Sequence, residues 1–446
     1  MTALSPARRV AHRVLRRVFD EGAWADRAFR AEAERAGLDS RERAFAQQLA
    51  YGTVQRVMTL DHVLAATASR PLDAIDPPVR DALRMGLLQL LFLDGVPDHA
   101  AVAQTVDLAA AERERARGFA NAVMRRAARD GRGLLAELRA DDTEGAALLH
   151  SHPRWLVEMW WEALGPAQAL ALLERDNESA ESSVRVNTLR ASPAEVEAEL
   201  RGLGAEPRAD PLVPEALVLA APFDAHGSEP FARGALIPQS RASMLVSRVL
   251  DPRLGERALD LCAAPGAKTT HLAARMEGSG TLVAVERHAG RCEQLAANCD
   301  RMGAPWTEVR CADAREPMAG GPFDRVLLDA PCSDLGTLQS RPDARWRKDP
   351  GQIAELAGLQ RELLEAAARA LAPGGVLVFS TCTISPQENE LLVGAFLEAH
   401  QELVADDLGA EHPALRHRSE PRFLQLLPHR DGTDGFFIAR LSRPNG

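Results

Sequence analysis

Residues 257–286 read RALDLCAAPGAKTTHLAARMEGSGTLVAVE, and two short apolar runs in this stretch, RALDL (257–261) and TLVAV (281–285), flank a loop of small residues. Further apolar runs are TEVRC (307–311), DRVLLDA (324–330) and GVLVFST (375–381). Helical patterns lie between several of them, most clearly over residues 353–371. This alternation predicts a Rossmann-like α/β domain, whose parallel, doubly wound sheet binds ligands at the carboxyl ends of its strands. The segment DGTDGFFIARL (431–441) adds a final strand.

The residues before this domain follow two other patterns. Residues 5–130 read as successive helices, with candidates at 6–19, 41–66, 77–93, 100–111 and 118–129. The middle of the chain is mixed, with helical patterns at 153–174 and 193–203 and strand patterns at SSVRVNTLR (182–190) and PEALVLAAP (214–222). We therefore expect three domains: an all-helical domain at 1–133, a small α+β connector at 134–240 and a catalytic domain at 241–446.

Composition places the chain among ordinary globular proteins. Of 446 residues, 46% are hydrophobic and 26% charged, and no apolar run approaches the ~20 residues that a membrane helix needs. The amino terminus lacks the apolar core of a signal peptide. The six cysteines, all between 262 and 382, show no close metal-ligand spacing. We expect a cytoplasmic protein with free thiols, no metal site and no membrane contact.

The net charge of −10 hides an asymmetry that bears on nucleic-acid binding. Residues 1–130 carry 20 arginines and 17 acidic residues, which gives about +3 and leaves about −13 for the remainder. Phosphate binding depends on local patches more than on the total charge. The average therefore does not exclude a nucleic-acid partner.

The loop after the first strand of the catalytic domain is the first candidate ligand site. It reads Cys262-Ala263-Ala264-Pro265-Gly266-Ala267-Lys268, which is neither a dinucleotide fingerprint nor a P-loop. Acids follow at the next strand ends: Glu286 is placed to accept ribose hydroxyls, Asp313 to contact an adenine amino group, and Asp329 ends the fourth strand. A single acid of this kind is explained equally well as a cap at the end of a strand, without any ligand. A series at successive strands favours an adenosyl ligand without phosphates, such as S-adenosylmethionine.

Two cysteines form the second candidate site. Cys332 follows the fourth strand in DAPCS, and Cys382 follows the fifth in STCT. If these strands are parallel neighbours, about 5 Å apart, both thiols lie at the rim that carries the adenosyl site. A lone cysteine is usually a small buried residue, but a pair beside a cofactor loop favours nucleophilic work. The spacing does not tell which cysteine attacks. The remaining cysteines, Cys292, Cys299 and Cys311, have no comparable partner and are taken as structural, as is the thiol of Cys262.

Cytosine methylation at carbon 5 would use such thiols. That carbon is a poor nucleophile, and a thiolate that adds to carbon 6 converts the ring into an enamine able to attack a sulfonium methyl group. The carbon-5 proton must then leave before the thiol is eliminated. The reaction needs a nucleophile, a group that handles the proton and an acid that engages nitrogen 3. Adenine N-methyltransferases carry a Pro-Pro-aromatic turn after the fourth strand. This chain has Ala330-Pro331-Cys332 there, which disfavours that class of enzyme.

Several motifs together resemble one family. LDLCAAPGAKTT, LLDAPCS, STCTISPQEN and DGFFIARL look like the motifs of the Nop/Sun RNA (cytosine-5) methyltransferases. RERAFAQQLAYGTVQR, LRMGLLQLLFLDGVPDHAAV and GFANAVMRR resemble the NusB-like RNA-binding domain of the Sun/RsmB branch, which modifies small-subunit ribosomal RNA. The likeness covers nearly the whole chain. It implies a methyltransferase that acts on 16S ribosomal RNA, and we expect a monomer.

The resemblance also assigns roles to residues. It implies that Cys382 is the nucleophile and that Cys332 assists product release. Cofactor contacts fall on Cys262 to Lys268, Glu286, Asp313 and Asp329, and Asp329 is also expected to face the target cytosine. Two positions depart from the family pattern: Ala267 replaces the second loop glycine, and Ser333-Asp334-Leu335-Gly336 replaces SGTG. The second departure leaves the RNA contacts open.

Lys268 and the arginines of the first helix complete the candidate residues. Because the chain has 51 arginines and two lysines, Lys268 is expected where a compact ammonium is required, and we count it as catalytic. Five arginines share one face of the first helix: Arg8, Arg9, Arg13, Arg16 and Arg17. The resemblance favours phosphate binding by this face over a merely solvated surface. Two alternatives stay open: the same chemistry on transfer RNA, and a non-catalytic RNA-binding assembly or antitermination factor.

Overall fold

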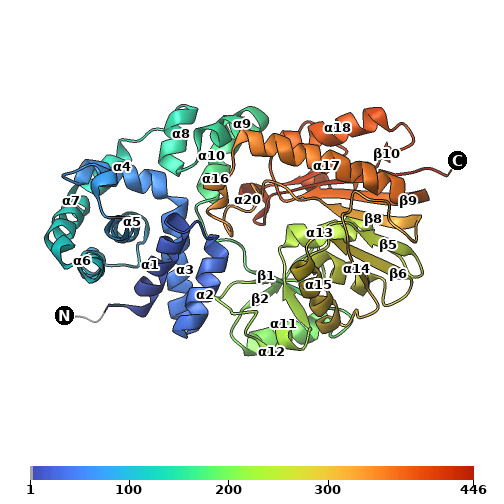
Figure 1. The fold of residues 1–446 in the computed structure, drawn as a ribbon, viewed down its shortest axis with the longest axis horizontal. Helices are drawn as coiled ribbons and strands as arrows, with labels where there is room; N and C mark the ends of the chain where they lie inside the picture. Colours follow the sequence, from blue (N-terminus) through green and yellow to red (C-terminus); the bar gives the residue numbers. More distant parts are fainter. Residues whose placement is uncertain (1–3, 446) are drawn as a thin grey trace. The chain divides into compact units, whose positions relative to one another are not determined.

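The computed structural model describes residues 4–445, which form two compact units. The first unit contains the residues up to Ser179 together with Leu338–Arg347. The second contains Ala180–Thr337 and the residues from Lys348 onward (Figure 1). Because Leu338–Arg347 lies between two elements of the second unit in the sequence, neither unit is one continuous stretch of chain.

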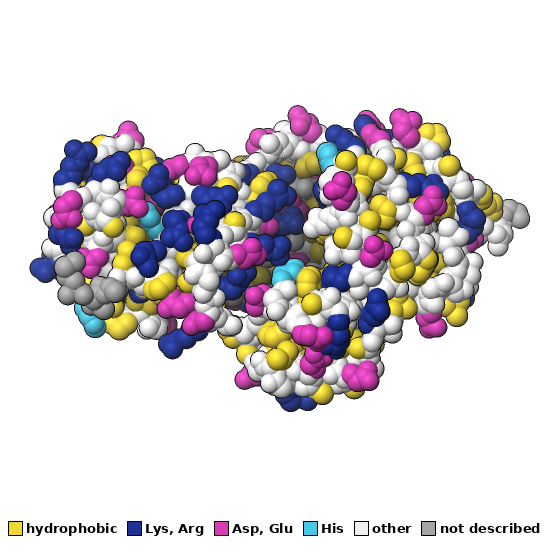
Figure 2. Space-filling model, turned by 60° about the horizontal axis from the view of Figure 1, so that its bottom comes forward, with side chains coloured by type: hydrophobic (Ala, Val, Ile, Leu, Met, Phe, Trp, Pro, Cys, Tyr) yellow, Lys and Arg dark blue, Asp and Glu magenta, His cyan; other side chains and the backbone are white. Residues whose placement is uncertain are grey.

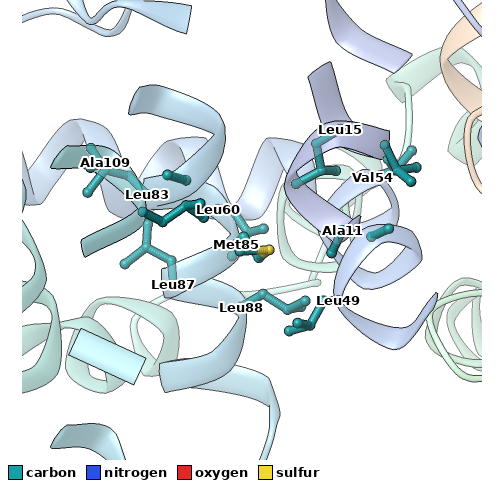
Figure 3. Packing of buried hydrophobic residues seen from close by; sticks show 14 of the residues in the cluster. Ala11, Leu15, Leu49, Val54, Leu60, Leu83, Met85, Leu87, Leu88 and Ala109 are labelled. Carbon is teal, nitrogen blue, oxygen red and sulfur yellow. The ribbon is translucent and has the colours of Figure 1, made fainter. Parts of the chain in front are cut away.

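The first unit is helical throughout its secondary structure. Its α-helices are α1 (Pro6–Phe19), α2 (Ala25–Ala36), α3 (Ser40–Gln55), α4 (Val57–Thr67), α5 (Pro77–Phe92), α6 (Asp98–Glu112), α7 (Arg117–Ala136), α8 (Thr143–His150), α9 (Arg154–Leu164), α10 (Pro166–Arg175) and α16 (Ala344–Arg347). Proline at the first position starts α1 and α5, where the missing N–H costs no hydrogen bond. The apolar faces of the N-terminal helices meet in one core, with Leu15, Leu49, Leu60 and Leu83 fully buried (Figure 3).

The helix predictions are confirmed for α1, α5 and α6 with small shifts at the ends, and for α7, which continues seven residues beyond its predicted end; three details were wrong. The helix expected over 41–66 is two helices, because the chain leaves helical geometry at Arg56. The helical stretch at 153–174 breaks at Gly165, whose φ of +81° is followed by Pro166 at the start of α10. Helix α2 was not predicted, because its buried face is mostly alanine and includes Glu32.

The part of the predicted connector from residue 180 onward begins the second unit with a four-stranded antiparallel sheet. The strands β1 (Ser183–Val186), β2 (Pro207–Ala209), β3 (Ala216–Leu219) and β4 (Leu236–Pro238) have the order β2-β3-β1-β4. Helix α11 (Pro193–Gly202) packs on this sheet, and the side chains of Ser192 and Glu195 form a capping box at its start. A short helix, α12 (Glu229–Ala232), precedes β4. The two predicted strands are confirmed as β1 and β3, whereas β2 and β4 are too short to show a pattern.

The second sheet of this unit has eight strands. The strands β5 (Arg257–Asp260), β6 (Thr281–Glu286), β7 (Glu308–Cys311), β8 (Phe323–Asp329) and β9 (Leu371–Thr381) are parallel, in the order β9-β8-β5-β6-β7. Strand β12 (Phe436–Ser442) pairs antiparallel with β9, and β10 (Val404–Ala405) and β11 (Leu424–Leu426) pair with β12. The predicted parallel sheet and its final strand are thus confirmed.

Helices cover both faces of this sheet. Alternate residues of β5, β6, β8, β9 and β12 enter two separate buried clusters, as the pleat of a sheet requires. One cluster packs against α17 (Pro350–Ala370) and α18 (Glu390–Ala399), and the other against α13 (Arg241–Leu250) and α14 (Ala267–Arg275). The other helices are α15 (Ala289–Arg301), α19 (Leu408–Glu411) and α20 (Pro428–Asp431). Two covered faces leave the carboxyl ends of the parallel strands as the edge where side chains of different strands meet.

Candidate active site

The loop Cys262–Lys268 joins β5 to α14 and has a fixed backbone. Gly266 has a φ of +103°, and a Cβ there would lie 2.8 Å from Leu295 Cδ1, so only glycine fits this position. The Arg291 guanidinium donates to the carbonyl of Ala264 (2.7 Å), and Asn298 Nδ2 donates to that of Pro265 (2.7 Å). The departure at Ala267 is accommodated, because this residue begins α14 and its φ is not positive.

The three predicted acids lie at the carboxyl ends of the strands, in different surroundings. Glu286 ends β6, is almost fully buried, and accepts a hydrogen bond from the backbone N–H of His288 (2.9 Å). Asp313 lies two residues after β7, and Arg315 donates to both of its carboxylate oxygens (3.0 and 2.6 Å). Those bonds lower the pKa of Asp313 to about 2. Asp329 ends β8.

A fourth acid at this edge, Asp260, was missed by the sequence analysis. It ends β5 and is almost fully buried, and Thr269 Oγ1 donates to its Oδ2 (2.7 Å). Burial raises its pKa to about 7. Its Oδ1 has no hydrogen-bond partner within the described chain. A buried oxygen in this state is costly, and a donor or cation from a ligand would satisfy it. The acid within the apolar run RALDL was the available signal.

The acids and the loop fit S-adenosylmethionine as a ligand. The molecule carries a sulfonium and an ammonium group, both positive, and this edge presents the carboxyl groups of Asp260, Glu286 and Asp329. The closely approachable loop backbone around Gly266 suits a nucleoside.

Lys268 and Asp329 form an ion pair beside this loop. Lys268 Nζ lies 2.8 Å from Asp329 Oδ2, and the Ser380 hydroxyl donates to Asp329 Oδ1 (2.8 Å). The ammonium also lies 5.1 Å from the centre of the Phe436 ring, within cation–π range. The Lys268 side chain is 11% exposed. Asp329 is therefore the acidic partner of the Lys268 ammonium.

The two cysteines are in contact. Cys332 Sγ and Cys382 Sγ are 3.3 Å apart, because β8 and β9 are parallel neighbours and each thiol follows the end of its strand. The Cys382 thiol donates to Asp334 Oδ1 at 3.1 Å. The hydrogen bond with Cys332, burial, and the charges of Asp334 and Asp329 raise the pKa of Cys382 well above its ordinary value.

These same side chains have the spacing of metal ligands. Cys332, Asp334 and Cys382 each offer one ligand atom, and the three atoms lie within 4.8 Å of one another. The sequence analysis expected no metal site, because the cysteines show no close metal-ligand spacing and Cys332 and Cys382 are fifty residues apart along the chain. All six cysteines are free thiols, as expected.

Polar residues that the sequence analysis did not single out hold the two cysteine loops. The Glu388 carboxylate accepts from the backbone N–H of Ser333 (2.9 Å) and from Gln360 Nε2 (3.0 Å). The amide of Asn389 accepts from Thr381 Oγ1 (2.6 Å) and donates to the carbonyl of Thr383 (3.0 Å), on either side of Cys382. Both residues belong to the quoted motif STCTISPQEN. The motif therefore supplies the supports of the thiol as well as the thiol.

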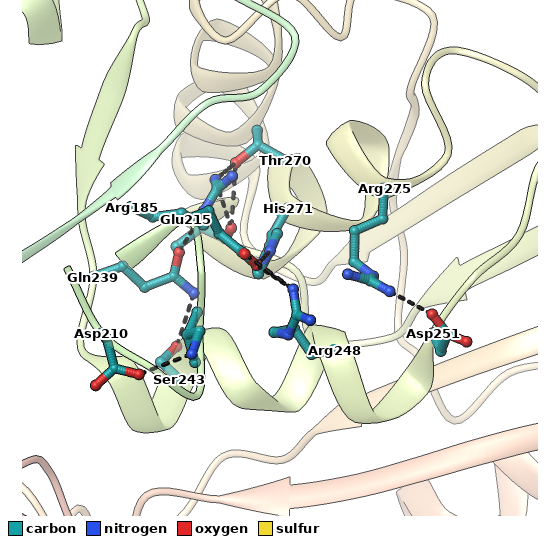
Figure 4. A network of polar contacts seen from close by, with 12 residues as sticks. Arg185, Asp210, Glu215, Gln239, Ser243, Arg248, Asp251, Thr270, His271 and Arg275 are labelled. Atoms are coloured by element: carbon teal, nitrogen blue, oxygen red, sulfur yellow. Dashed lines mark hydrogen bonds and ion pairs between the residues drawn. The ribbon is translucent and has the colours of Figure 1, made fainter. Parts of the chain in front are cut away.

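The connector contacts the helix that carries Lys268. Arg185 of β1, fully buried, donates to Thr270 Oγ1 (2.8 Å), to the carbonyl of Ala267 (3.2 Å) and to Gln239 Oε1 (2.8 Å). Next to it, the Glu215 carboxylate and His271 Nε2 of α14 are 2.6 Å apart (Figure 4). These contacts fix the first turns of α14 against the connector sheet.

The arginines of α1 are largely engaged with neighbouring side chains. Arg13 and Arg17 form ion pairs with the buried Glu32 of α2 (2.8 and 3.4 Å), and Arg16 pairs with Asp20 (2.5 Å). Arg8 donates to Gln89, whereas Arg9 is exposed. Figure 2 shows arginine side chains (dark blue) over the N-terminal helices with Asp and Glu among them. RNA binding by this helix stays a prediction.

Comparisons with known proteins agree with the three kinds of fold. Family models match at residues 5–129 (NusB family), 152–226 (the ferredoxin-like domain of RsmF/B-like methyltransferases) and 247–442 (16S rRNA methyltransferase RsmB/F). The probable ribosomal RNA small subunit methyltransferase B of Synechocystis is 35% identical, with 98% of this chain and 99% of that protein covered. The ribosomal RNA small subunit methyltransferase B of Vibrio cholerae is 37% identical, with 90% of each chain covered. The solved structure of PH0851 is 30% identical and superposes with a TM-score of 0.81, covering 99% of both chains.

Proposed function

The chain belongs to the RsmB/F family of 16S rRNA methyltransferases, and from this premise we propose that it methylates carbon 5 of a cytosine in 16S ribosomal RNA. The observation that carries the carbon-5 assignment is the contact between Cys332 and Cys382, 3.3 Å apart at the ends of adjacent parallel strands. Two thiols at a rim shared with an adenosyl site suit a reaction in which the enzyme bonds covalently to the base.

In this proposal Cys382 is the nucleophile. Its sulfur adds to carbon 6 of the cytosine, which makes carbon 5 electron-rich. S-adenosylmethionine, when bound, supplies the electrophilic methyl group. Asp329 is held by Lys268 and Ser380, and it faces nitrogen 3 of the base. Cys332 assists the loss of the carbon-5 proton and the release of the methylated base from Cys382.

The cofactor is proposed to lie along the edge formed by β8, β5, β6 and β7. The backbone of Cys262–Lys268 approaches it, Glu286 accepts the ribose hydroxyls, and Asp313 contacts the adenine. We add Asp260 to the proposed cofactor contacts, because its buried Oδ1 has no hydrogen-bond partner among the described residues. Arg315 holds the Asp313 carboxylate and so fixes its direction.

The proposal also covers the compartment and the oligomeric state of the protein. Among the described residues, no helix has the length and apolar character that crossing a membrane requires. We propose a monomer that acts in the cytoplasm, with the N-terminal helices contributing RNA contacts. Six free thiols suit a reducing compartment.

The covalent step can be tested by trapping. If Cys332 serves release and Cys382 serves attack, Cys332→Ala should stay bonded to RNA through Cys382. Incubation with S-adenosylmethionine and 16S ribosomal RNA should then give a protein band of reduced mobility on a denaturing gel. The control is the double variant Cys332→Ala/Cys382→Ala, which should show no such band. A band that persists in the double variant, or is absent from the single one, contradicts the assignment.

A further inference from the structure

Asp334 occupies an unusual backbone conformation for a residue with a side chain. Its φ is +61°, in the left-handed region that favours glycine and that aspartate and asparagine tolerate best among the other residues. The N–H and the hydroxyl of Thr337 both donate to its carbonyl (3.0 and 2.9 Å), which closes a tight turn. The next residues are held too, because the N–H of Gly336 donates to the carbonyl of Cys382 (2.9 Å). The turn thus fixes the Asp334 carboxylate beside Cys382.

We propose that the Asp334 carboxylate accepts the proton of the Cys382 thiol when the sulfur attacks the base; this rests on the proposed function. The S–H bond breaks, the proton passes to Asp334 Oδ1, and the sulfur electron pair forms the bond to carbon 6. The carbon 5–carbon 6 pair shifts to carbon 5, where it bonds the methyl group as the methyl–sulfonium bond of S-adenosylmethionine breaks, and the pair of that bond stays on the donor sulfur, which leaves as a neutral thioether. On release, which Cys332 assists, the carbon-5 proton is lost and passes on to water, its electron pair restores the double bond, and the carbon 6–sulfur pair returns to sulfur. Asp334 then returns its proton to the thiolate.

The distances around the thiol favour Asp334 over its neighbours. Cys382 Sγ lies 3.1 Å from Asp334 Oδ1, a hydrogen-bond distance for sulfur. The oxygens of Asp329 are already bonded to Lys268 and Ser380. The Lys268 charge, which could otherwise stabilise a thiolate, is paired with Asp329.

The groups around Cys382 favour a reaction in which a carboxylate accepts the thiol proton. The groups that face Cys382 are Cys332, Asp334 and Asp329, and together with burial they raise the pKa of its thiol. Because the Cys382 thiol donates a hydrogen bond to Asp334 Oδ1, it carries its proton in this arrangement and must lose it during attack. A carboxylate already hydrogen-bonded to that proton provides general-base catalysis.

Two variants of Asp334 separate a proton acceptor from a structural residue. Asp334→Asn keeps the shape and tolerates the left-handed backbone, whereas Asp334→Gly removes the side chain and leaves space. In single-turnover methylation of 16S ribosomal RNA at pH 7, both should lose about 100-fold or more in rate with unchanged binding of S-adenosylmethionine and RNA. Sodium formate should restore part of the rate to Asp334→Gly but not to Asp334→Asn, because asparagine fills the space.

The pH dependence supplies a second readout. Without the acceptor, the reaction depends on thiolate formed in solution, so the rates of both variants should rise about tenfold per pH unit above pH 7, more steeply than the wild-type rate. Variants that stay within about threefold of wild type at pH 7 overturn the proposal. So does a loss that neither formate nor higher pH relieves, which would mark a structural role. If the wild-type protein itself forms no 5-methylcytosine, the proposed function fails instead.

Discussion

Lys268 was singled out from the sequence because lysine is rare in this chain. In a chain with 51 arginines and two lysines, it lies at the start of α14, 2.8 Å from Asp329 and above the Phe436 ring. A cation at a helix start opposes the helix dipole, so this position is unfavourable without a partner. The ion pair with Asp329 explains how it is tolerated. A compact ammonium fits between the carboxylate and the ring, whereas a guanidinium is wider and bonds in a fixed fork.

We therefore expect Lys268→Arg to fold normally and to lose most of its methyl transfer. The thermal melting temperature should match that of wild type, because the charge and the burial of the stem are kept. The matched control is Lys348→Arg, at the other lysine of the chain, which should retain wild-type activity. Near-normal methylation by Lys268→Arg would show that any cation suffices at this position.

The residues named from the sequence and those missed differ in one physical respect. Cys332, Cys382 and Asp329 follow strands whose apolar runs are visible, so the parallel arrangement brings them together without knowledge of the packing. Glu388 and Arg185 act through partners that are 55 and 85 residues away in the sequence, Ser333 and Thr270. Which polar side chains become buried supports depends on tertiary packing that periodicity does not encode.

Helix α1 illustrates the same limit at the scale of an element. Its bounds, Pro6–Phe19, agree with the sequence, because proline starts it and its apolar residues repeat at helical spacing. The partners of its arginines were not predicted, because α2 itself was not predicted. The buried Glu32 of α2 binds Arg13 and Arg17, so part of the basic face serves helix packing.

RNA binding by α1 is tested by replacing Arg9, Arg13 and Arg16 with glutamine. If the helix binds phosphates, affinity for 16S ribosomal RNA should fall and its dependence on salt should flatten, because fewer counterions are released. Arg13→Gln alone also weakens the pair with Glu32, so circular dichroism must show an intact helical unit. The separate variant Arg9→Gln, at the exposed position, should weaken binding without a change in stability. Unchanged affinity and salt slope would make this face a solvated surface.

The contact between α14 and the connector makes the stability of this region depend on pH. Burial, followed by the charge of Arg185, lowers the pKa of His271 to about 3, while the unfolded chain titrates near its ordinary value of 6.5. Between these values the unfolded state binds a proton that the folded state does not, so stability falls as pH falls. The hydrogen bond with His271 and the charge of Arg248 outweigh burial and lower the pKa of Glu215, which acts in the same direction below its ordinary value of 4.5.

We expect His271→Gln to remove one titrating group from this contact. The free energy of unfolding should then change less with pH between 6 and 4, by up to about 1.4 kcal/mol per pH unit. Urea denaturation measures this free energy of unfolding. Hydrogen exchange in peptides from α14 is the probe, so the result reports on the second unit alone. An unchanged slope would mean that His271 is protonated in the folded protein.

At the scale of the whole molecule, the two units are interwoven along the sequence. Leu338–Arg347 belongs to the helical unit although it lies between β8 and α17. Arg345, fully buried, donates to Asn177 Oδ1 (2.8 Å) and to the carbonyl of Asp176 (2.9 Å), and the Trp346 indole N–H donates to the carbonyl of Val54 (2.9 Å). Contacts between residues nearly 300 positions apart produce no recognisable pattern in the local sequence. The division at 133/134 and 240/241 stays a prediction, and a fragment ending at residue 133 would lack this segment.

The central claim is tested most directly by identifying the methylated nucleoside. The protein is incubated with labelled S-adenosylmethionine and, in separate reactions, naked 16S ribosomal RNA, assembled 30S particles and transfer RNA, and each RNA is then digested to nucleosides. The account predicts label in 5-methylcytidine from 16S ribosomal RNA, in at least one of its two forms, and none with Cys382→Ala, which should still bind S-adenosylmethionine. Label in a cytidine methylated on nitrogen, label confined to transfer RNA, or undiminished label with Cys382→Ala would contradict it.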